Sequence, residues 1–190
     1  RHTKVHVQEW VMNRHKLLQE LTGETIRGED FTDDSLGLLL KRLSDEDIWL
    51  RIEDELWQSS RVIHQIKVEG VRLDSTTSYG YHEINDDGIM QHGHSKDKRP
   101  DLAQLKLMLA VAEPSGVPIA SDVLAGERAD DPLYGPLIKR VRQILWGKRG
   151  LLYTGDSKMA ALTTRADIVA HHDYYLTVLP HKGETAQQWD

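Results

Sequence analysis

The stretch Val71-Arg72-Leu73-Asp74-Ser75-Thr76-Thr77 marks the point where the sequence changes from a helical to a strand pattern. Val71 and Leu73 alternate with polar residues, which is typical of a half-buried β-strand, and the polar run from Asp74 onward predicts the end of that strand. Open α/β sheets present their ligand-binding groups at such strand ends. Asp74 is therefore the first candidate site residue.

A helical pattern precedes this stretch. From residue 5 to about residue 67, apolar side chains recur at three- and four-residue spacing among charged ones, which predicts an α-helical arm. A helix that runs to Leu43 is expected to be capped at its start by one of three polar residues, Asp33, Asp34 or Ser35. The change of period predicts two domains, a helical region over residues 1–66 and a second domain over residues 67–190.

Strands and helices are mixed in the second domain. Residues 105–113 and 117–124 are expected to pair as an antiparallel hairpin around Pro114-Ser115-Gly116. The elements expected after it are a helix from Pro136 to Gly147, a strand over 151–154, a helix over 159–170 and a strand over 174–179. The order strand, strand, strand, helix, strand, helix, strand predicts an α+β, or mixed α/β, domain with helices flanking the sheet.

The composition limits the classes of protein that fit. A chain of 190 residues, 39% of them hydrophobic, can bury one core of ordinary size beside a smaller helical appendage. Cysteine is absent, which excludes disulfides and thiolate metal sites and fits a reducing cytoplasm. The longest apolar run, Leu107 to Ala112, is far shorter than the roughly 18 residues of a membrane span, so no membrane contact is expected.

Charge and chain ends add two expectations. The net charge of −6 argues against a protein that coats nucleic acid, because such binding needs clustered Lys and Arg, so local basic patches must carry any DNA contact. The chain opens with Arg1 and has no signal-peptide pattern, and it is expected to be a fragment.

A second aspartate, Asp156, follows the strand predicted at residues 151–154. If this strand lies beside and parallel to the first, the Asp74 and Asp156 carboxylates converge at one edge of the sheet. Close carboxylates repel each other unless a cation neutralises them, and oxygen ligands suit Mg²⁺ or Mn²⁺, which support in-line phosphoryl transfer. The alternative is structural, because an aspartate after a strand is also a common turn residue or helix N-cap.

Further motifs accompany the two aspartates. The first is followed by Gly80-Tyr81-His82-Glu83, Gly93-His94-Ser95-Lys96-Asp97 and Arg99-Pro100-Asp101-Leu102, and the second lies in Thr154-Gly155-Asp156-Ser157-Lys158-Met159. Upstream lies Phe31-Thr32-Asp33-Asp34-Ser35-Leu36-Gly37. Over nearly the whole chain, these motifs resemble those of bacterial insertion-sequence transposases of the DDE type, whose first two metal-binding acids match Asp74 and Asp156.

The resemblance implies a fold, an activity and partners. The fold would be ribonuclease H-like, a mixed five-stranded sheet with the first two acids on adjacent strands. The activity would be cleavage and strand transfer of insertion-element ends, with Asp74 and Asp156 holding Mg²⁺ or Mn²⁺. The partners would be double-stranded DNA, as element ends and target, and a second copy of the chain on the DNA, in a bacterial cytoplasm and associated with the nucleoid.

This sequence departs from the family pattern at the third acid. It is normally a glutamate in a Tyr-Arg-Glu-Lys motif on a downstream helix, and that motif does not occur up to Asp190. Glu184 stands in His181-Lys182-Gly183-Glu184-Thr185, which lacks the motif. The chain is therefore expected to end before the third acid.

Basic and histidine clusters are further candidate sites. Lys96, Lys98 and Arg99 form a compact loop that is a candidate for DNA phosphates. A second basic cluster could also meet DNA phosphates, but a solvated helix face is the preferred interpretation; it comprises Lys139, Arg140, Arg142, Lys148 and Arg149. The histidine cluster lacks the ligand spacing of a zinc site and comprises His82, His92 and His94. His171 and His172 are expected to cap a helix end.

Other functions compete with a transposase fragment. A non-catalytic remnant would retain the fold as a DNA-binding or interaction module. A phosphohydrolase with an aspartate nucleophile ranks last, because Asp74 has no second acid two residues on.

Overall fold

The structure is a computed structural model that describes residues 3–94 and 98–178. These residues form two compact units that divide between Ile52 and Glu53. The first unit consists of α1 (Thr3–Met12), α2 (His15–Thr22), the 3-10 turn η1 (Gly28–Phe31), α3 (Asp33–Leu43) and the start of α4 (Glu46–Ile63). The predicted helical arm is confirmed, and the domain boundary proposed at residues 66–67 remains a prediction.

Thr32 caps helix α3, in place of the three residues predicted from the sequence, Asp33, Asp34 and Ser35. Its backbone is extended, and its Oγ1 accepts a hydrogen bond from the Ser35 amide at 3.2 Å. Asp33 and Asp34 lie in the first helical turn, where the positive end of the helix dipole stabilises their negative charges. The prediction was wrong because the cap residue must lie outside the helix with non-helical backbone angles.

A Thr32→Ala substitution is expected to lower the free energy of unfolding of the first unit by about 1 kcal/mol, the usual cost of a lost N-cap. Chemical denaturation followed by circular dichroism at the helical band measures the loss. Thr32→Ser keeps the cap oxygen and is the matched control. An equal loss in both variants would contradict the assigned role of the hydroxyl.

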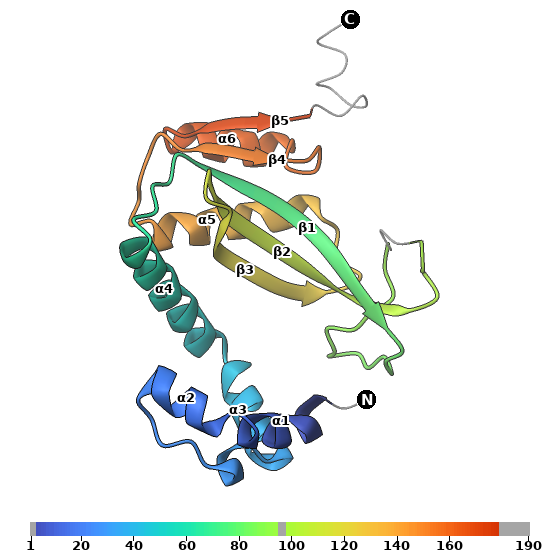
Figure 1. The fold of residues 1–190 in the computed structure, drawn as a ribbon. Helices are drawn as coiled ribbons and strands as arrows, with labels where there is room; N and C mark the ends of the chain where they lie inside the picture. Colours follow the sequence, from blue (N-terminus) through green and yellow to red (C-terminus); the bar gives the residue numbers. More distant parts are fainter. Residues whose placement is uncertain (1–2, 95–97, 179–190) are drawn as a thin grey trace, which may run out of the picture. The chain divides into compact units, whose positions relative to one another are not determined.

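The second unit is built around a five-stranded sheet with the strand order β3-β2-β1-β4-β5 (Figure 1). The strands are β1 (Gly70–Gly80), β2 (Ala103–Glu113), β3 (Val117–Ala125), β4 (Leu152–Gly155) and β5 (Tyr174–Thr177). Strands β1, β2 and β3 pair antiparallel, whereas β4 is parallel to both β1 and β5. This order and pairing are those of the ribonuclease H-like fold, so the predicted fold class is confirmed.

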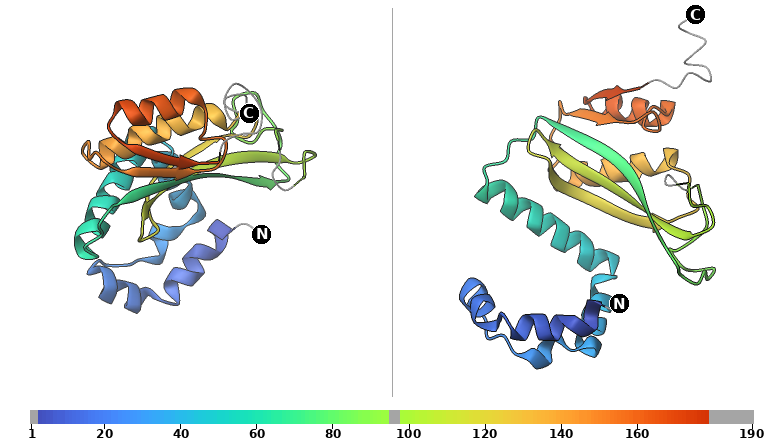
Figure 2. Two further views of the ribbon diagram at one scale, coloured as in Figure 1. Left: turned by 90° about the horizontal axis from the view of Figure 1, so that it is seen from above. Right: turned by 45° about the vertical axis from the view of Figure 1, so that its right-hand side comes forward.

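Two helices cover one face of this sheet, α5 (Tyr134–Ile144) and α6 (Leu162–Ala170), as the view from above in Figure 2 shows. The helices pack on every second residue of the strands, whose side chains are buried. The core formed by strand and helix residues includes Val71, Leu73, Met108, Ala110, Leu137, Ile138, Val141, Tyr153 and Ile168. On the opposite face Val123, Leu152, Tyr174 and Leu176 are between 38% and 66% exposed. The second face therefore carries partly exposed apolar side chains on β3, β4 and β5 beside the exposed Arg72 and Asp74 of β1.

Strand β1 is longer than predicted. It continues past Asp74 to Gly80 because it pairs with β2 over its whole length, from Gly70↔Glu113 to Gly80↔Ala103. Ser75 keeps the alternation of the strand, since it is buried on the core side although polar. The prediction that β1 ends at Asp74 was wrong. Asp74 instead lies just beyond Arg72, the last residue of β1 that pairs with β4.

The remaining elements occur in the predicted order with shifted ends. Helix α5 begins at Tyr134 rather than Pro136, because the 3-10 turn η2 (Asp131–Leu133) leads directly into it. Helix α6 begins at Leu162 rather than at residue 159, after a turn that follows Asp156. Within the described part of the chain, no helix has both the length and the apolar character needed to cross a membrane.

Candidate metal centre at Asp74 and Asp156

Asp74 lies on β1 just beyond the stretch that pairs with β4. The parallel register runs Gly70↔Leu152, Val71↔Tyr153 and Arg72↔Thr154, and the antiparallel partner of Asp74 on β2 is Leu109. The Asp74 side chain is exposed, and its Oδ1 accepts a hydrogen bond from the Ser75 amide at 2.7 Å. Asp74 is therefore held on a central strand of the sheet with its carboxylate open to solvent.

Asp156 follows β4 directly. When the register between β1 and β4 is continued by two residues past Arg72↔Thr154, Asp74 comes level with Asp156. Neighbouring strands lie about 4.8 Å apart, so residues at equivalent positions of parallel strands are close neighbours. The predicted arrangement of two parallel adjacent strands is confirmed, and it brings both aspartates to one end of the β1–β4 pair.

Several hydrogen bonds hold Asp156, including one from the Met159 amide to its carbonyl oxygen at 3.1 Å. Its Oδ1 accepts hydrogen bonds from the Tyr134 hydroxyl at 2.7 Å and from the Lys158 amide at 2.9 Å. Its main-chain carbonyl accepts one from the Thr177 hydroxyl at 2.6 Å. The Oδ2 atoms of Asp156 and Asp74 accept no hydrogen bond from residues 3–94 and 98–178. Each carboxylate thus keeps one oxygen available.

Gly155 allows the strand to pass close to the core before it reaches Asp156. A Cβ at this position would lie 2.8 Å from the Met159 sulfur and 3.4 Å from the Leu73 carbonyl oxygen. Met159 is fully buried, so it has little room to move. The glycine therefore sets the position of Asp156 through the packing beneath it.

The phenol of Tyr134 is affected by both aspartates. Burial raises the pKa of Tyr134 well above its ordinary value, and the hydrogen bond to Asp156 and the negative charges of Asp156, Asp74 and Asp130 raise it further. The hydroxyl therefore stays protonated and acts as a hydrogen-bond donor.

The donor set fits a hard divalent cation in type, since carboxylate oxygens are the ligands that Mg²⁺ and Mn²⁺ prefer. The number of donors is smaller than a complete site needs. Within the described residues, no group of three His, Cys, Asp or Glu side chains is placed to hold a metal ion. Asp74 and Asp156 therefore remain two candidate ligands, with no third His, Cys, Asp or Glu grouped with them among the described residues.

The basic loop proposed for DNA lies between β1 and β2, and Lys96 is outside the described residues. Arg99 makes two hydrogen bonds with the Asp101 carboxylate, at 2.9 and 2.7 Å, and its guanidinium lies 6.0 Å from the ring centre of Tyr79. Lys98 is exposed. The role of these three residues in DNA binding remains a prediction.

The second basic cluster is not a uniformly solvated helix face, as the sequence suggested. Arg140 is only 13% exposed and forms ion pairs with Glu53 and Asp122. Arg142 is 12% exposed and pairs with Asp167 at 2.7 Å. The interpretation was wrong because the partners come from α4, β3 and α6, which are far away in the sequence.

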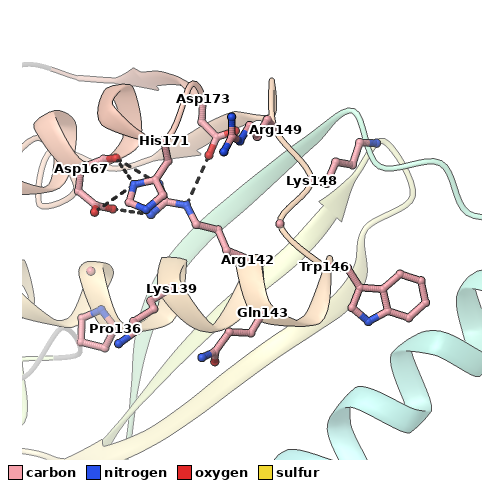
Figure 3. A pocket seen from close by; sticks show the side chains of 12 residues that line it. Pro136, Lys139, Arg142, Gln143, Trp146, Lys148, Arg149, Asp167, His171 and Asp173 are labelled. Carbon is pink, nitrogen blue, oxygen red and sulfur yellow. Dashed lines mark hydrogen bonds and ion pairs between the residues drawn. The ribbon is translucent and has the colours of Figure 1, made fainter.

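A hollow of about 1030 Å³ lies along α5 and the end of α6 (Figure 3). Arg142 points across it toward Asp167 and Asp173, while Lys139 and Trp146 lie along its α5 side. Neither Asp74 nor Asp156 lines it. It is therefore separate from the candidate metal centre.

The predicted helix cap near His171 is confirmed. His171 stands at the C-cap of α6, and its Nδ1 lies 2.9 Å from the Asp167 carbonyl oxygen.

Tyr134 and Thr177 were missed by sequence analysis. Their hydroxyls reach Asp156 from α5 and β5, 22 and 21 residues away along the chain. No motif marks either residue, because a tyrosine before a helix and a threonine in a strand have ordinary structural roles.

No protein-family model matches the chain, and no curated protein matches it. Solved structures do. One is a piggyBac transposase synaptic complex with hairpin DNA, with 11% identity, a TM-score of 0.46, and coverage of 96% of this chain and 42% of that one. Another is a Mos1 transposase paired-end complex with left transposon end, with 11% identity, a TM-score of 0.41, and coverage of 92% and 58%. A third is a Mos1 mariner paired-end complex with Mn, with 13% identity, a TM-score of 0.39, and coverage of 95% and 59%. The chain spans 42% to 59% of the length of these proteins.

Proposed function

We propose that this chain is part of a metal-dependent DNA transposase of the DDE type and contributes the first two of its three catalytic acids, Asp74 and Asp156. The observation that supports the proposal is the parallel pairing of β1 and β4, whose last pair, Arg72↔Thr154, lies two residues before Asp74 on β1 and two residues before Asp156 in the turn after β4. The sequence motifs around both residues resemble those of insertion-sequence transposases and support the same proposal.

Mg²⁺ or Mn²⁺ would be held by the available carboxylate oxygens of Asp74 and Asp156. When bound, two such ions would activate an attacking water or 3′-hydroxyl and would stabilise the leaving oxygen in an in-line displacement at phosphorus. The protein itself positions the two carboxylates, Asp74 through continuous β1–β2 pairing and Asp156 through Tyr134, Lys158 and Thr177. The reaction would cleave element ends and join them to target DNA.

The third acid would come from a segment outside the described residues. The open sheet face is a suitable place for it, because Asp74 and its exposed or half-buried apolar neighbours share that face. Asp74 pairs with Leu109 of β2. Leu107, two residues before Leu109 and on the same face of β2, pairs with Val123 of β3. A helix that covers these residues would bring an acidic side chain beside Asp74.

Double-stranded DNA and a second copy of the chain are the proposed partners. Of the similar solved structures, one is a complex with hairpin DNA, one a complex with a transposon end and one a complex with Mn. The net charge of −6 means that DNA must be approached through local groups such as Lys98 and Arg99, or through residues outside those described. Association with the bacterial nucleoid would follow from this activity.

A second candidate function is a non-catalytic interaction module. It is favoured by the two-carboxylate site, which has no third acid among the described residues, and by the partly exposed apolar side chains on the open sheet face. In such a remnant the two aspartates would bind no cation.

Titration of the purified chain with Mg²⁺ and Mn²⁺ tests the proposal, with binding followed by calorimetry and by the midpoint of thermal unfolding. At 100 times its dissociation constant, the ion should stabilise the native chain by about 2.7 kcal/mol. Asp74→Asn and Asp156→Asn should each remove the binding. Asp86→Asn, an equally isosteric change in an exposed turn, is the matched control. Absence of saturable binding in the wild-type chain favours the interaction module.

A further inference from the structure

We propose that Tyr134 is a positioning residue that holds the Asp156 carboxylate in one orientation, with Oδ1 turned to the protein and Oδ2 turned outward. This inference rests on the proposed function for its consequence, which is metal affinity. The orientation itself is a property of the side chains in the second unit.

The hydrogen bond comes from a rigid donor. Tyr134 is fully buried at the start of α5, with its ring in the same core cluster as Leu137 and Tyr153. Its hydroxyl reaches out of this cluster to Asp156 Oδ1 at 2.7 Å. Because the ring is surrounded by packed side chains, the hydroxyl cannot follow the carboxylate to another position. The donor therefore selects among the rotamers of Asp156.

A second donor acts on the same oxygen. The Lys158 amide binds Asp156 Oδ1 at 2.9 Å, and the Thr177 hydroxyl binds the Asp156 carbonyl oxygen at 2.6 Å. With the main chain held from β5 and Oδ1 held by two donors, rotation of the carboxylate breaks at least one contact. Oδ2 is then the oxygen left for an external ligand, in a fixed direction.

The hydrogen bond also links α5 to the turn after β4. An Asp156 carboxylate that turned away would leave the buried Tyr134 hydroxyl without its partner, which is unfavourable because a buried donor then loses its hydrogen bond. Groups that orient metal-binding side chains in this way typically change metal affinity by roughly 10- to 100-fold when they are removed. Tyr134 is thus expected to affect cation binding without touching the cation.

Tyr134→Phe removes only the hydroxyl and keeps the ring in the core. Tyr153→Phe is the matched control, since Tyr153 is equally buried and its hydroxyl interacts with Arg142 rather than with Asp156. Its neighbouring charges are those of Asp173, Arg142 and Asp167 rather than those of the two aspartates.

The first measurement is Mn²⁺ affinity of the full chain by calorimetry. Tyr134→Phe should weaken binding by roughly 10- to 100-fold, whereas Tyr153→Phe should bind as the wild-type chain does. Wild-type affinity in Tyr134→Phe, with binding still lost in Asp156→Asn, would overturn the inference and leave the proposed function standing.

The second measurement needs no metal. Three-bond NMR couplings across the Asp156 Cα–Cβ bond should report one rotamer in the wild-type chain and in Tyr153→Phe, and averaging among rotamers in Tyr134→Phe. If the wild-type chain binds no Mn²⁺ but shows this change, the proposed function fails and the positioning role holds. A single rotamer retained in Tyr134→Phe, or averaging already present in the wild-type chain, contradicts the positioning role.

Discussion

An Asp156→Cys variant is expected to lose Mg²⁺ binding and to gain affinity for thiolate-seeking cations such as Zn²⁺ or Co²⁺. A thiolate is a soft ligand that binds zinc well and magnesium poorly, whereas a carboxylate has the opposite preference. The chain contains no cysteine, so the introduced sulfur would be its only thiol. The Mg²⁺-dependent stabilisation of about 2.7 kcal/mol at 100 times the dissociation constant should disappear. Thermal unfolding with each cation measures both effects, and the expected loss corresponds to roughly 5–10 °C in the midpoint.

A second substitution tests whether the two aspartates share the cation. In the Asp156→Cys variant, bound Co²⁺ gives a sulfur-to-cobalt charge-transfer absorption that reports the site directly. Adding Asp74→Asn should weaken Co²⁺ binding, because β1 and β4 bring residue 74 level with residue 156. Adding Asp86→Asn should not. Unchanged binding after Asp74→Asn would show that Asp74 lies outside the site.

The sequence predicts the sheet well because the pattern of burial is local. Val71 and Leu73 alternate with polar residues, and the hairpin around Pro114-Ser115-Gly116 is marked by its own turn residues. Strand ends are harder to predict, since β1 beyond Asp74 is stabilised by pairing with β2, whose residues lie about 30 positions away. Neither the polarity pattern nor the composition of Ser75-Thr76-Thr77 indicates that these residues pair with β2.

The site could be predicted only in part. The two aspartates follow from strand positions and motifs, but Tyr134 and Thr177 depend on how α5 and β5 pack against the end of β4. The role of Arg140 depends on packing in the same way. It lies between Lys139 and Val141 in a run of basic and apolar residues, and its residue type does not distinguish it from Lys139, which is exposed.

Replacement of Arg140 by leucine is expected to be one of the most destabilising single changes in the second unit. Arg140 joins α5 to Glu53 of α4 and to Asp122 of β3, with all three side chains 13% to 22% exposed. Glu53 also accepts hydrogen bonds from the Ser121 amide and hydroxyl, at 2.7 and 2.8 Å, so it cannot easily turn toward solvent.

The expected loss of unfolding free energy for Arg140→Leu is about 3 kcal/mol, because the change leaves two partly buried carboxylates without their cation. Arg72→Leu is the control, since Arg72 pairs with Glu113 at 3.3 Å while 60% exposed, and such surface pairs contribute roughly 0–1 kcal/mol. Urea unfolding of both variants measures the difference. The triple variant Glu53→Gln, Asp122→Asn, Arg140→Leu should recover part of the loss, because it also removes the two negative charges that Arg140 balances. Equal losses in Arg140→Leu and Arg72→Leu would show that the buried cation does not hold α4, α5 and β3 together.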